Sequence, residues 1–442
     1  MQVARGLLGC RVRSLQIPAR ATGTAAQIRW SQLLLHVSAA TQWRVGLYRS
    51  SSAWSQSSNT STTETDVFSE KYTPVFGSHL GRCLDRPAVH DDAGSYTYAE
   101  VYRLAGAIRD QIVNKGGIQP TRTSDGPCTN DIDEGRVVPR VAYLCPGDVR
   151  YVATLWAIWK CGLSAVPLFH EHPISVMEYY VIDSQASLLV STREFELKLK
   201  ELGSKTNTPV IILDETDEIG SGPSWSDTPK WCELETYDAL MMYTSGTTGP
   251  PKGVVLRHAN LRFQTSQIRD AWQWSERDRI LHALPLHHTH GIVSGILTPL
   301  YSGACVRMLP KFDPNRIWQH LLLETEPEYP VSIFMGVPTM YIKLLSYFEN
   351  HLAANWPLEE VHKAIRTHIR FLISGSAPLP EPVYKRIEAT MGLEVIERYG
   401  MTEVGIPLSN ALHGKRYAGE LRGLPNKKHR SSNRSIGGPP YC

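Results

Sequence analysis

The sequence predicts an α/β fold in which parallel-rich sheets are flanked by helices. Short apolar segments rich in valine, isoleucine and leucine alternate with segments of helical apolar spacing, from about residue 96 to residue 397. This alternation is typical of βαβ units and a mostly parallel sheet. The chain has 442 residues, of which 42% are apolar, so it is long enough for more than one core. We expect two α/β subdomains, residues 67–235 and 236–419.

The first subdomain is expected to begin with a strand at residues 96–98 and a helix at 99–115. That helix carries apolar residues on one face: Val101, Leu104, Ile108 and Ile112. Strands and helices then alternate: a strand at 138–144, a helix at 149–160, a strand at 164–168, a helix at 175–184 and a strand at 187–190. Four aromatic side chains are expected to pack without a functional role: Trp156, Trp159, Tyr179 and Tyr180.

Composition excludes several classes of protein. The net charge of +3 is close to neutral, so we expect no nucleic-acid partner. The eight cysteines are scattered without a Cys-x-x-Cys pair, which argues against a disulfide framework and a zinc knuckle. The best candidate for a membrane span, residues 155–169, is too short and contains Lys160. We therefore expect no membrane span.

The first 66 residues have the composition of a leader. Seven arginines, no lysine and many serines precede Glu64, the first acidic residue. This pattern is typical of a mitochondrial transit peptide followed by a Ser/Thr-rich linker, and it predicts a location in the mitochondrial matrix. An ordinary disordered basic tail is the alternative.

A loop dense in glycine and hydroxyl residues lies between two apolar runs, residues 239–242 and 254–256, which predict a pair of strands. Its glycines permit positive φ, so backbone N–H groups can turn toward an anion, while hydroxyls and an ammonium add donors. A Walker A loop is excluded, because that pattern ends in Gly-Lys-Ser/Thr and opens a helix. The loop predicts a phosphate site, with a flexible hairpin loop as the alternative. Its residues are Thr244, Ser245, Gly246, Thr247, Thr248, Gly249, Pro250, Pro251 and Lys252.

Four histidines follow within nine residues: His282, His287, His288 and His290. A zinc site is one interpretation, but no nearby acid or cysteine completes the ligand set, and neighbouring residues of an extended segment face opposite ways. A structural role is another. We favour a substrate pocket, in which an imidazole N–H orients a reacting carboxylate, with His288 and His290 as candidates.

Arg307 interrupts an apolar strand expected at residues 304–309. Burying a guanidinium is costly unless an anion pairs with it. Two interpretations stay open. The arginine either points to solvent from an edge strand, or it clamps a second carboxylate of the substrate.

Two later segments could complete a nucleotide site. After a strand at residues 370–373, a turn of small residues lets a flat ring lie against the backbone: Gly375, Ser376 and Ala377. After a strand at 394–397 come Tyr399, Gly400, Thr402 and Glu403. The tyrosine can stack on adenine, the threonine can donate to a phosphate, and the glutamate can hold Mg²⁺.

In order and spacing, the Thr/Gly loop, the Leu-Pro-Leu-His-His-Thr-His-Gly segment and the Tyr-Gly-Met-Thr-Glu segment resemble the motifs of the adenylate-forming enzymes. The resemblance implies the large N-terminal domain of the acyl-CoA synthetase fold. It implies that the loop holds the β- and γ-phosphates of ATP, and that residues 375–377 lie on the adenine side. It also implies that His288 lies beside the reacting carboxylate.

From residue 239 to residue 419 the chain is most similar to malonyl-CoA synthetases, and with its leader to the mitochondrial ones. The implied reaction uses ATP and Mg²⁺ to convert the acid, malonate, to an acyl-adenylate, and coenzyme A then accepts the acyl group. The first step depends mostly on positioning and on neutralisation of charge.

The resemblance stops near Gly419, and residues 427–434 contain no apolar side chain. We expect a divergent, disordered basic tail at 420–442 and no small C-terminal domain. The chain alone is then expected to make little product. The rival interpretation is a non-catalytic fragment that binds nucleotide or a partner. A luciferase-like or peptide-synthetase adenylation module ranks below both.

Overall fold

The computed structural model describes residues 83–118, 138–213, 235–244, 249–413, 416 and 422–423. Two units are distinguished, residues 1–61 and 62–442, and every described residue belongs to the second. The predicted leader at 1–66 lies outside the described residues. So does the predicted tail at 420–442, except for Arg422–Gly423, which pair with a neighbouring strand as β15.

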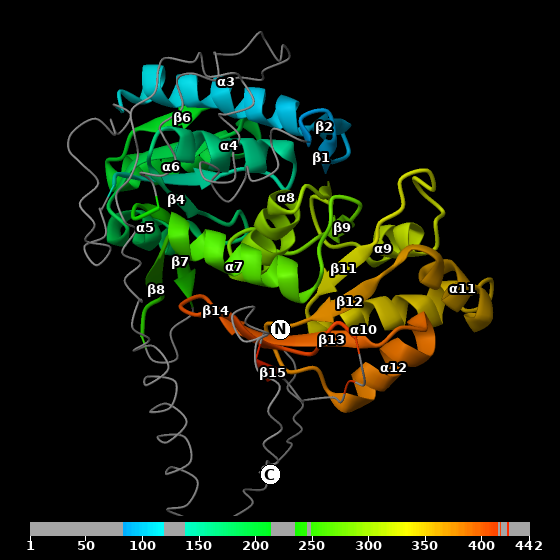
Figure 1. The fold of residues 1–442 in the computed structure, drawn as a ribbon. Helices are drawn as coiled ribbons and strands as arrows, with labels where there is room; N and C mark the ends of the chain where they lie inside the picture. The colour runs from blue at the N-terminus through cyan, green and yellow to red at the C-terminus, as the bar shows by residue number, and fades with distance from the viewer. Residues whose placement is uncertain are drawn as a thin grey trace, which may run out of the picture. The chain divides into compact units, whose positions relative to one another are not determined.

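One sheet has six strands in the order β6-β5-β3-β4-β7-β8 (Figure 1). All neighbours are parallel except β7 and β8, which form an antiparallel pair. The strands are β3 (Arg140–Leu144), β4 (Ser164–Pro167), β5 (Ala186–Ser191), β6 (Val210–Ile212), β7 (Asp238–Thr244) and β8 (Lys252–Arg257). Its helices are α3 (Tyr98–Gly116), α4 (Val149–Lys160), α5 (Ile174–Asp183), the short η2 (Arg193–Phe195) and α6 (Glu196–Thr206).

The other sheet has nine strands in the order β15-β14-β13-β12-β11-β9-β10-β1-β2, and it is parallel from β13 to β1. Its strands are β1 (Pro87–His90), β2 (Ser95–Thr97), β9 (Arg279–His282), β10 (Cys305–Met308), β11 (Ile333–Gly336), β12 (Phe371–Ser374), β13 (Val395–Met401), β14 (Gly405–Ser409) and β15. Its helices are α7 (His258–Ala271), α8 (Thr298–Tyr301), α9 (Pro314–Leu321), α10 (Pro338–Tyr347), α11 (Leu358–His368) and α12 (Glu381–Met391), with π-helices η5 (His290–Leu297) and η6 (Phe348–Leu352).

Local sequence explains where the first helices begin and end. The Thr97 hydroxyl accepts from the Glu100 N–H, and the Glu100 carboxylate accepts from the Thr97 N–H, which forms a capping box at the start of α3. Gly117 ends the helix at φ +64°. Helix α4 is apolar on all sides, and Asp148 caps its start. All residues of α4 except Arg150 are buried, as a helix without a polar face requires.

The observed elements confirm the predicted alternation and the parallel-rich sheets. Trp156 and Trp159 are fully buried, and one continuous core spans α3, α4 and the strands of the nine-stranded sheet. The division expected at residue 235, however, does not separate the two sheets. Strands β7 and β8 complete the first sheet, whereas β1 and β2 belong to the second.

None of the helices in the described ranges combines the length and the apolar character that crossing a membrane needs.

Candidate functional site

The order of the strands predicts a binding site at the carboxyl ends of the parallel strands of the nine-stranded sheet, which form one edge of that sheet. Strand β9 lies between β10 and β11, so the chain leaves β9 toward one side and later continues on the other. In open parallel sheets, ligands bind at the carboxyl ends of strands beside such a reversal. The histidine loop follows β9, and Ser376 follows β12. Both segments therefore reach this edge.

A cavity of about 580 Å³ lies at this edge. It collects residues from the β7–β8 hairpin, the histidine loop, η5, the turn after β12 and the β13–β14 hairpin. Lys252 and Glu403 line the same cavity, although the segments that carry them belong to different sheets. The lining residues are Thr244, Lys252, His288, Thr289, His290, Ser294, Ser376, Arg398, Gly400, Met401, Thr402, Glu403, Gly405 and Ile406.

The β7–β8 hairpin supplies the stem of the predicted phosphate loop. Thr244 pairs with Lys252 across the two strands, and both side chains face the cavity. Gly249 has a φ of +124°, which agrees with the expectation that the loop glycines adopt positive φ. Pro250 and Pro251 lie at the exit. The middle of the predicted loop lies outside the described residues: Ser245, Gly246, Thr247 and Thr248.

The histidines of the loop after β9 separate into different roles. His290 is 5% exposed; its Nδ1 lies 3.3 Å from the Ser376 hydroxyl, and its Nε2 has no hydrogen-bond partner in the described part of the chain. Burial and the nearby Arg398 charge hold the pKa of His290 well below its usual value, so the ring is neutral. His288 lines the cavity with a pKa that burial lowers less far. Both candidates reach the cavity.

The other two histidines do not reach the cavity. His282 is buried, with Nε2 3.0 Å from the Gly291 carbonyl, and burial lowers its pKa to about 4. His287 stacks on Phe169 with ring centroids 4.1 Å apart. Over the described ranges, no group of three or more His, Cys, Asp or Glu side chains is arranged to hold a metal ion.

Arg398 is a charged cavity residue to which the sequence analysis gave no role. It lies on β13, is 7% exposed and donates from one terminal nitrogen to the Ser376 hydroxyl at 3.3 Å. Its Nε has no hydrogen-bond partner among the described residues, and burial lowers the pKa of the guanidinium to about 10. A β-carbon at Gly375 would overlap the guanidinium. The small residue predicted to admit a flat ring therefore makes room for an arginine.

The β13–β14 hairpin supplies the remaining predicted residues. Gly400, Thr402 and Glu403 line the cavity. Tyr399 is 51% exposed, and neither it nor Gly375 nor Ala377 is among the lining residues. The Glu403 carboxylate has no ion-pair partner within the described ranges, so it is available for a cation.

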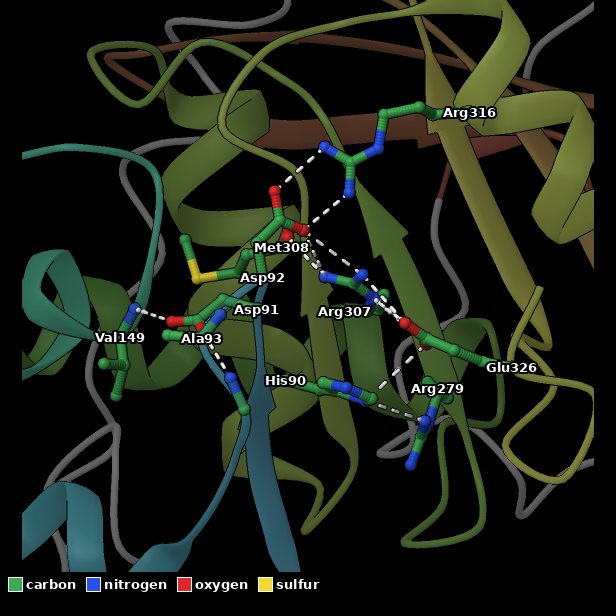
Figure 2. Close-up of polar contacts among 11 residues, drawn as sticks. His90, Asp91, Asp92, Ala93, Val149, Arg279, Arg307, Met308, Arg316 and Glu326 are labelled. Atoms are coloured by element: carbon green, nitrogen blue, oxygen red, sulfur yellow. Dashed lines mark hydrogen bonds and ion pairs between the residues drawn. The ribbon is translucent and has the colours of Figure 1, made fainter.

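The structure does not bring Arg307 to the cavity. Figure 2 shows its guanidinium among carboxylates of the chain. Arg307 is 4% exposed, and its guanidinium lies 2.8 Å from the Glu326 carboxylate and 3.3 Å from that of Asp92. Two carboxylates of the chain itself supply the anions that a substrate was expected to supply. The solvent-facing alternative does not hold either, because β10 is an interior strand between β9 and β1.

Comparison with known proteins adds to this geometry. Residues 133–442 match the family described as AMP-binding enzyme. The mitochondrial malonate–CoA ligase of Xenopus laevis is 38% identical over 351 residues, which are 79% of this chain and 58% of that protein. The human mitochondrial malonate–CoA ligase is 35% identical over 349 residues, which are 78% of this chain and 57% of that protein.

Solved structures agree. ATP-bound MatB from Rhodopseudomonas palustris matches with a TM-score of 0.63 and 28% identity, over 80% of this chain and 64% of that chain. A malonyl-CoA ligase with methylmalonyl-CoA and AMP bound matches with a TM-score of 0.60 and 30% identity, over 79% of this chain and 64% of that chain. The chain thus spans a little over half the length of the curated relatives it matches.

Proposed function

The chain belongs to the family of AMP-binding enzymes, and from this premise we propose that its cavity binds Mg·ATP and malonate for ligation to coenzyme A. The observation that carries the choice of acid is the buried guanidinium of Arg398, whose charge no carboxylate of the described chain balances. A buried charge of this kind is stable only with an anion beside it.

The inner wall of the cavity suits the carboxylate that does not react. Arg398 and His290 both contact the Ser376 hydroxyl, so the three side chains form one group. The Nε2 of His290 and the hydroxyl of Ser294 are buried, and neither has a hydrogen-bond partner in the part of the chain that the structure describes. A carboxylate accepts hydrogen bonds from several donors at once, and a dicarboxylic acid can therefore leave its second carboxyl group free to react.

The outer wall of the cavity suits the nucleotide. Lys252 from the hairpin stem supplies a cation toward the β- and γ-phosphates, and Thr244 lines the cavity beside it. Thr402 donates to the α-phosphate, and Glu403 together with phosphate oxygens would hold Mg²⁺, which neutralises charge on the triphosphate when bound.

The reaction has two steps. An oxygen of the malonate carboxylate, oriented by His288, attacks the α-phosphorus of ATP, and pyrophosphate leaves. The sulfur of the coenzyme A thiolate then attacks the acyl carbon, and AMP leaves with the electrons of the cleaved C–O bond. This chain contributes positioning and charge neutralisation to the first step.

A location in mitochondria is part of the proposal. The names of the animal relatives place those proteins in mitochondria. The arginine-rich, acid-free composition of residues 1–63 fits import into the matrix.

The second candidate function is binding of a nucleotide without catalysis. Two measurements on one sample separate the two candidates. Calorimetry measures binding of Mg·ATP, and a second assay measures pyrophosphate release when malonate is added. Nucleotide binding without release supports the second candidate, and the absence of both overturns the nucleotide site itself.

The choice of acid is tested with Arg398→Met. Binding of malonate and of acetate is measured in the presence of AMP. We expect malonate affinity to fall more than about tenfold, because a hydrogen-bonded charge pair is lost, and acetate affinity to stay within about twofold. An equal loss for both acids would remove Arg398 as the site of the second carboxylate.

A further inference from the structure

Three side chains of α5 contact β7 or the residue directly before β8, on the two sides of the phosphate loop. The Tyr179 hydroxyl donates to the Pro251 carbonyl at 2.8 Å, one residue before Lys252. The Tyr180 ring stacks on the Tyr243 ring with centroids 4.0 Å apart and planes 8° apart. The Tyr243 hydroxyl lies 2.7 Å from the Asp183 carboxylate. One helix therefore holds the loop where it leaves β7 and where it enters β8.

The exit of the loop needs this support more than its start does. Strand β7 has hydrogen-bonded neighbours on both sides, β4 and β8, whereas β8 lies at the end of the strand order and, among the described strands, pairs with β7 alone. Pro250 and Pro251 lack the N–H groups that would bind a neighbouring backbone. The Tyr179 hydroxyl gives Pro251 a partner from outside the sheet.

Restraining Pro251 also restrains Lys252. The Pro251 carbonyl carbon is bonded directly to the Lys252 nitrogen through a planar peptide bond, so fixing this carbonyl also fixes the start of the lysine backbone. Thr244 contacts the Lys252 carbonyl from the opposite strand at 3.4 Å. The long lysine side chain then starts from a defined backbone position, which lowers the entropy lost when its ammonium meets a phosphate.

We propose that Tyr179 is a positioning residue for the phosphate loop, acting through its hydrogen bond to Pro251 to set Lys252 against the terminal phosphates of ATP. The proposal rests on the proposed function, because it takes the loop to hold the β- and γ-phosphates. It assigns a role to a tyrosine that the sequence analysis placed among packing aromatics.

The test compares two nucleotides on the same variant, Tyr179→Phe. ATP carries the phosphates that the loop contacts and AMP does not. We expect the dissociation constant of Mg·ATP to rise about threefold to tenfold, the usual effect of losing one hydrogen bond, and that of AMP to stay within about twofold. A general loss of folding would weaken both nucleotides equally, and that result, or no change for ATP, overturns the proposal.

Tyr180→Phe is the matched control. Tyr180 is the neighbouring residue of the same helix. Phenylalanine keeps the stacked ring, and the Tyr243 hydroxyl donates to the Tyr180 backbone carbonyl, which the substitution leaves in place. We expect its ATP-to-AMP ratio to equal that of the unaltered chain. A selective loss of ATP affinity in this control would show that the Tyr179 hydroxyl is not the cause, and would overturn the assignment.

A second measurement needs no nucleotide. Trypsin cleaves after Lys252 only when the start of β8 opens, so the Tyr179→Phe chain is expected to be cut there several times faster than the Tyr180→Phe chain. Equal cleavage rates overturn the proposal. If the unaltered chain binds neither nucleotide, the proposed function fails, while the proteolysis result still decides whether Tyr179 holds the loop.

Discussion

Thr289 donates its side-chain hydroxyl to that of Thr402 at 3.1 Å, across 113 residues of sequence. The contact joins the loop after β9 to the segment after β13 at the wall of the cavity. Because Thr402 accepts this bond, its own hydroxyl hydrogen is free to point into the cavity. The pair therefore orients a donor toward a bound phosphate.

The two members of this pair are expected to respond differently to substitution by valine. Thr402→Val removes the donor to a charged phosphate, so the dissociation constant of Mg·ATP should rise more than about tenfold. Thr289→Val removes only the orienting partner and should raise it about threefold. Calorimetric titration of both variants measures the difference. A larger effect for Thr289 would mean that the phosphate contact belongs to the loop after β9.

Arg307→Met should lower stability and leave malonate binding unchanged. It leaves the Glu326 carboxylate without its arginine, while Asp92 keeps Arg316 (Figure 2), and breaking a buried pair costs about 3 kcal/mol of unfolding free energy. Arg316→Met is the control, since Arg316 pairs with Asp92 from a more exposed position and should cost less than about 1 kcal/mol. Denaturant unfolding and malonate titration give the two readouts. Loss of malonate affinity with unchanged stability would restore Arg307 as the substrate clamp.

Stability should fall as the pH drops from 6.5 to 5, and His258 should account for part of the slope. Burial lowers the pKa of His258 to about 3, whereas the unfolded chain has the ordinary value near 6.5. Below pH 6.5 the unfolded state therefore binds more protons than the folded state, which favours unfolding. His258→Leu removes this difference. Between pH 6.5 and 5 the variant should therefore lose about 1.5 kcal/mol less of its unfolding free energy than the unaltered chain. Identical slopes in denaturant unfolding would contradict the assignment.

Gly291→Ala should disturb the histidine loop. A β-carbon at Gly291 would overlap the carbonyl oxygen of Pro285, and relieving such an overlap costs about 1–3 kcal/mol or moves the loop. Gly94→Ala is the control, because no atom lies within 4 Å of its added β-carbon. We expect lower thermal stability and weaker malonate binding in the first variant only. Unchanged values in both would mean that the loop tolerates the displacement.

Local sequence was sufficient for most elements and for the motifs that converge. Helix α4 matches its expected bounds, and the β7–β8 pair follows from two apolar runs around a glycine-rich loop. Eight of the predicted site residues line the cavity: Thr244, Lys252, His288, His290, Ser376, Gly400, Thr402 and Glu403. Their chemistry depends on residue type and order along the chain, which a sequence shows directly.

Pairing between distant segments could not be predicted in the same way. Arg307 looks uncompensated because Asp92 and Glu326 approach it only after β1 pairs with β10 and the loop beyond α9 folds back. Arg398 carried the missing signal, since it is a charged residue directly before Tyr399 and in the same motif as Thr402 and Glu403, to which the sequence analysis gave roles. Which of two arginines faces the ligand depends on side-chain direction, and tertiary contacts decide that.

The N-terminal strands β1 and β2 belong to the nine-stranded sheet, whose other strands come from residue 279 onward. This arrangement affects how the protein is made. During synthesis, β1 and β2 emerge before β10, the strand beside which β1 must settle, and more than two hundred residues separate the two. The early hairpin therefore waits on the ribosome with an open edge, where chaperones can hold it or neighbouring chains can capture it. If the gene were divided at residue 235, the first half would lack β7 and β8 of its sheet, and the second half would lack β1 and β2 of its sheet.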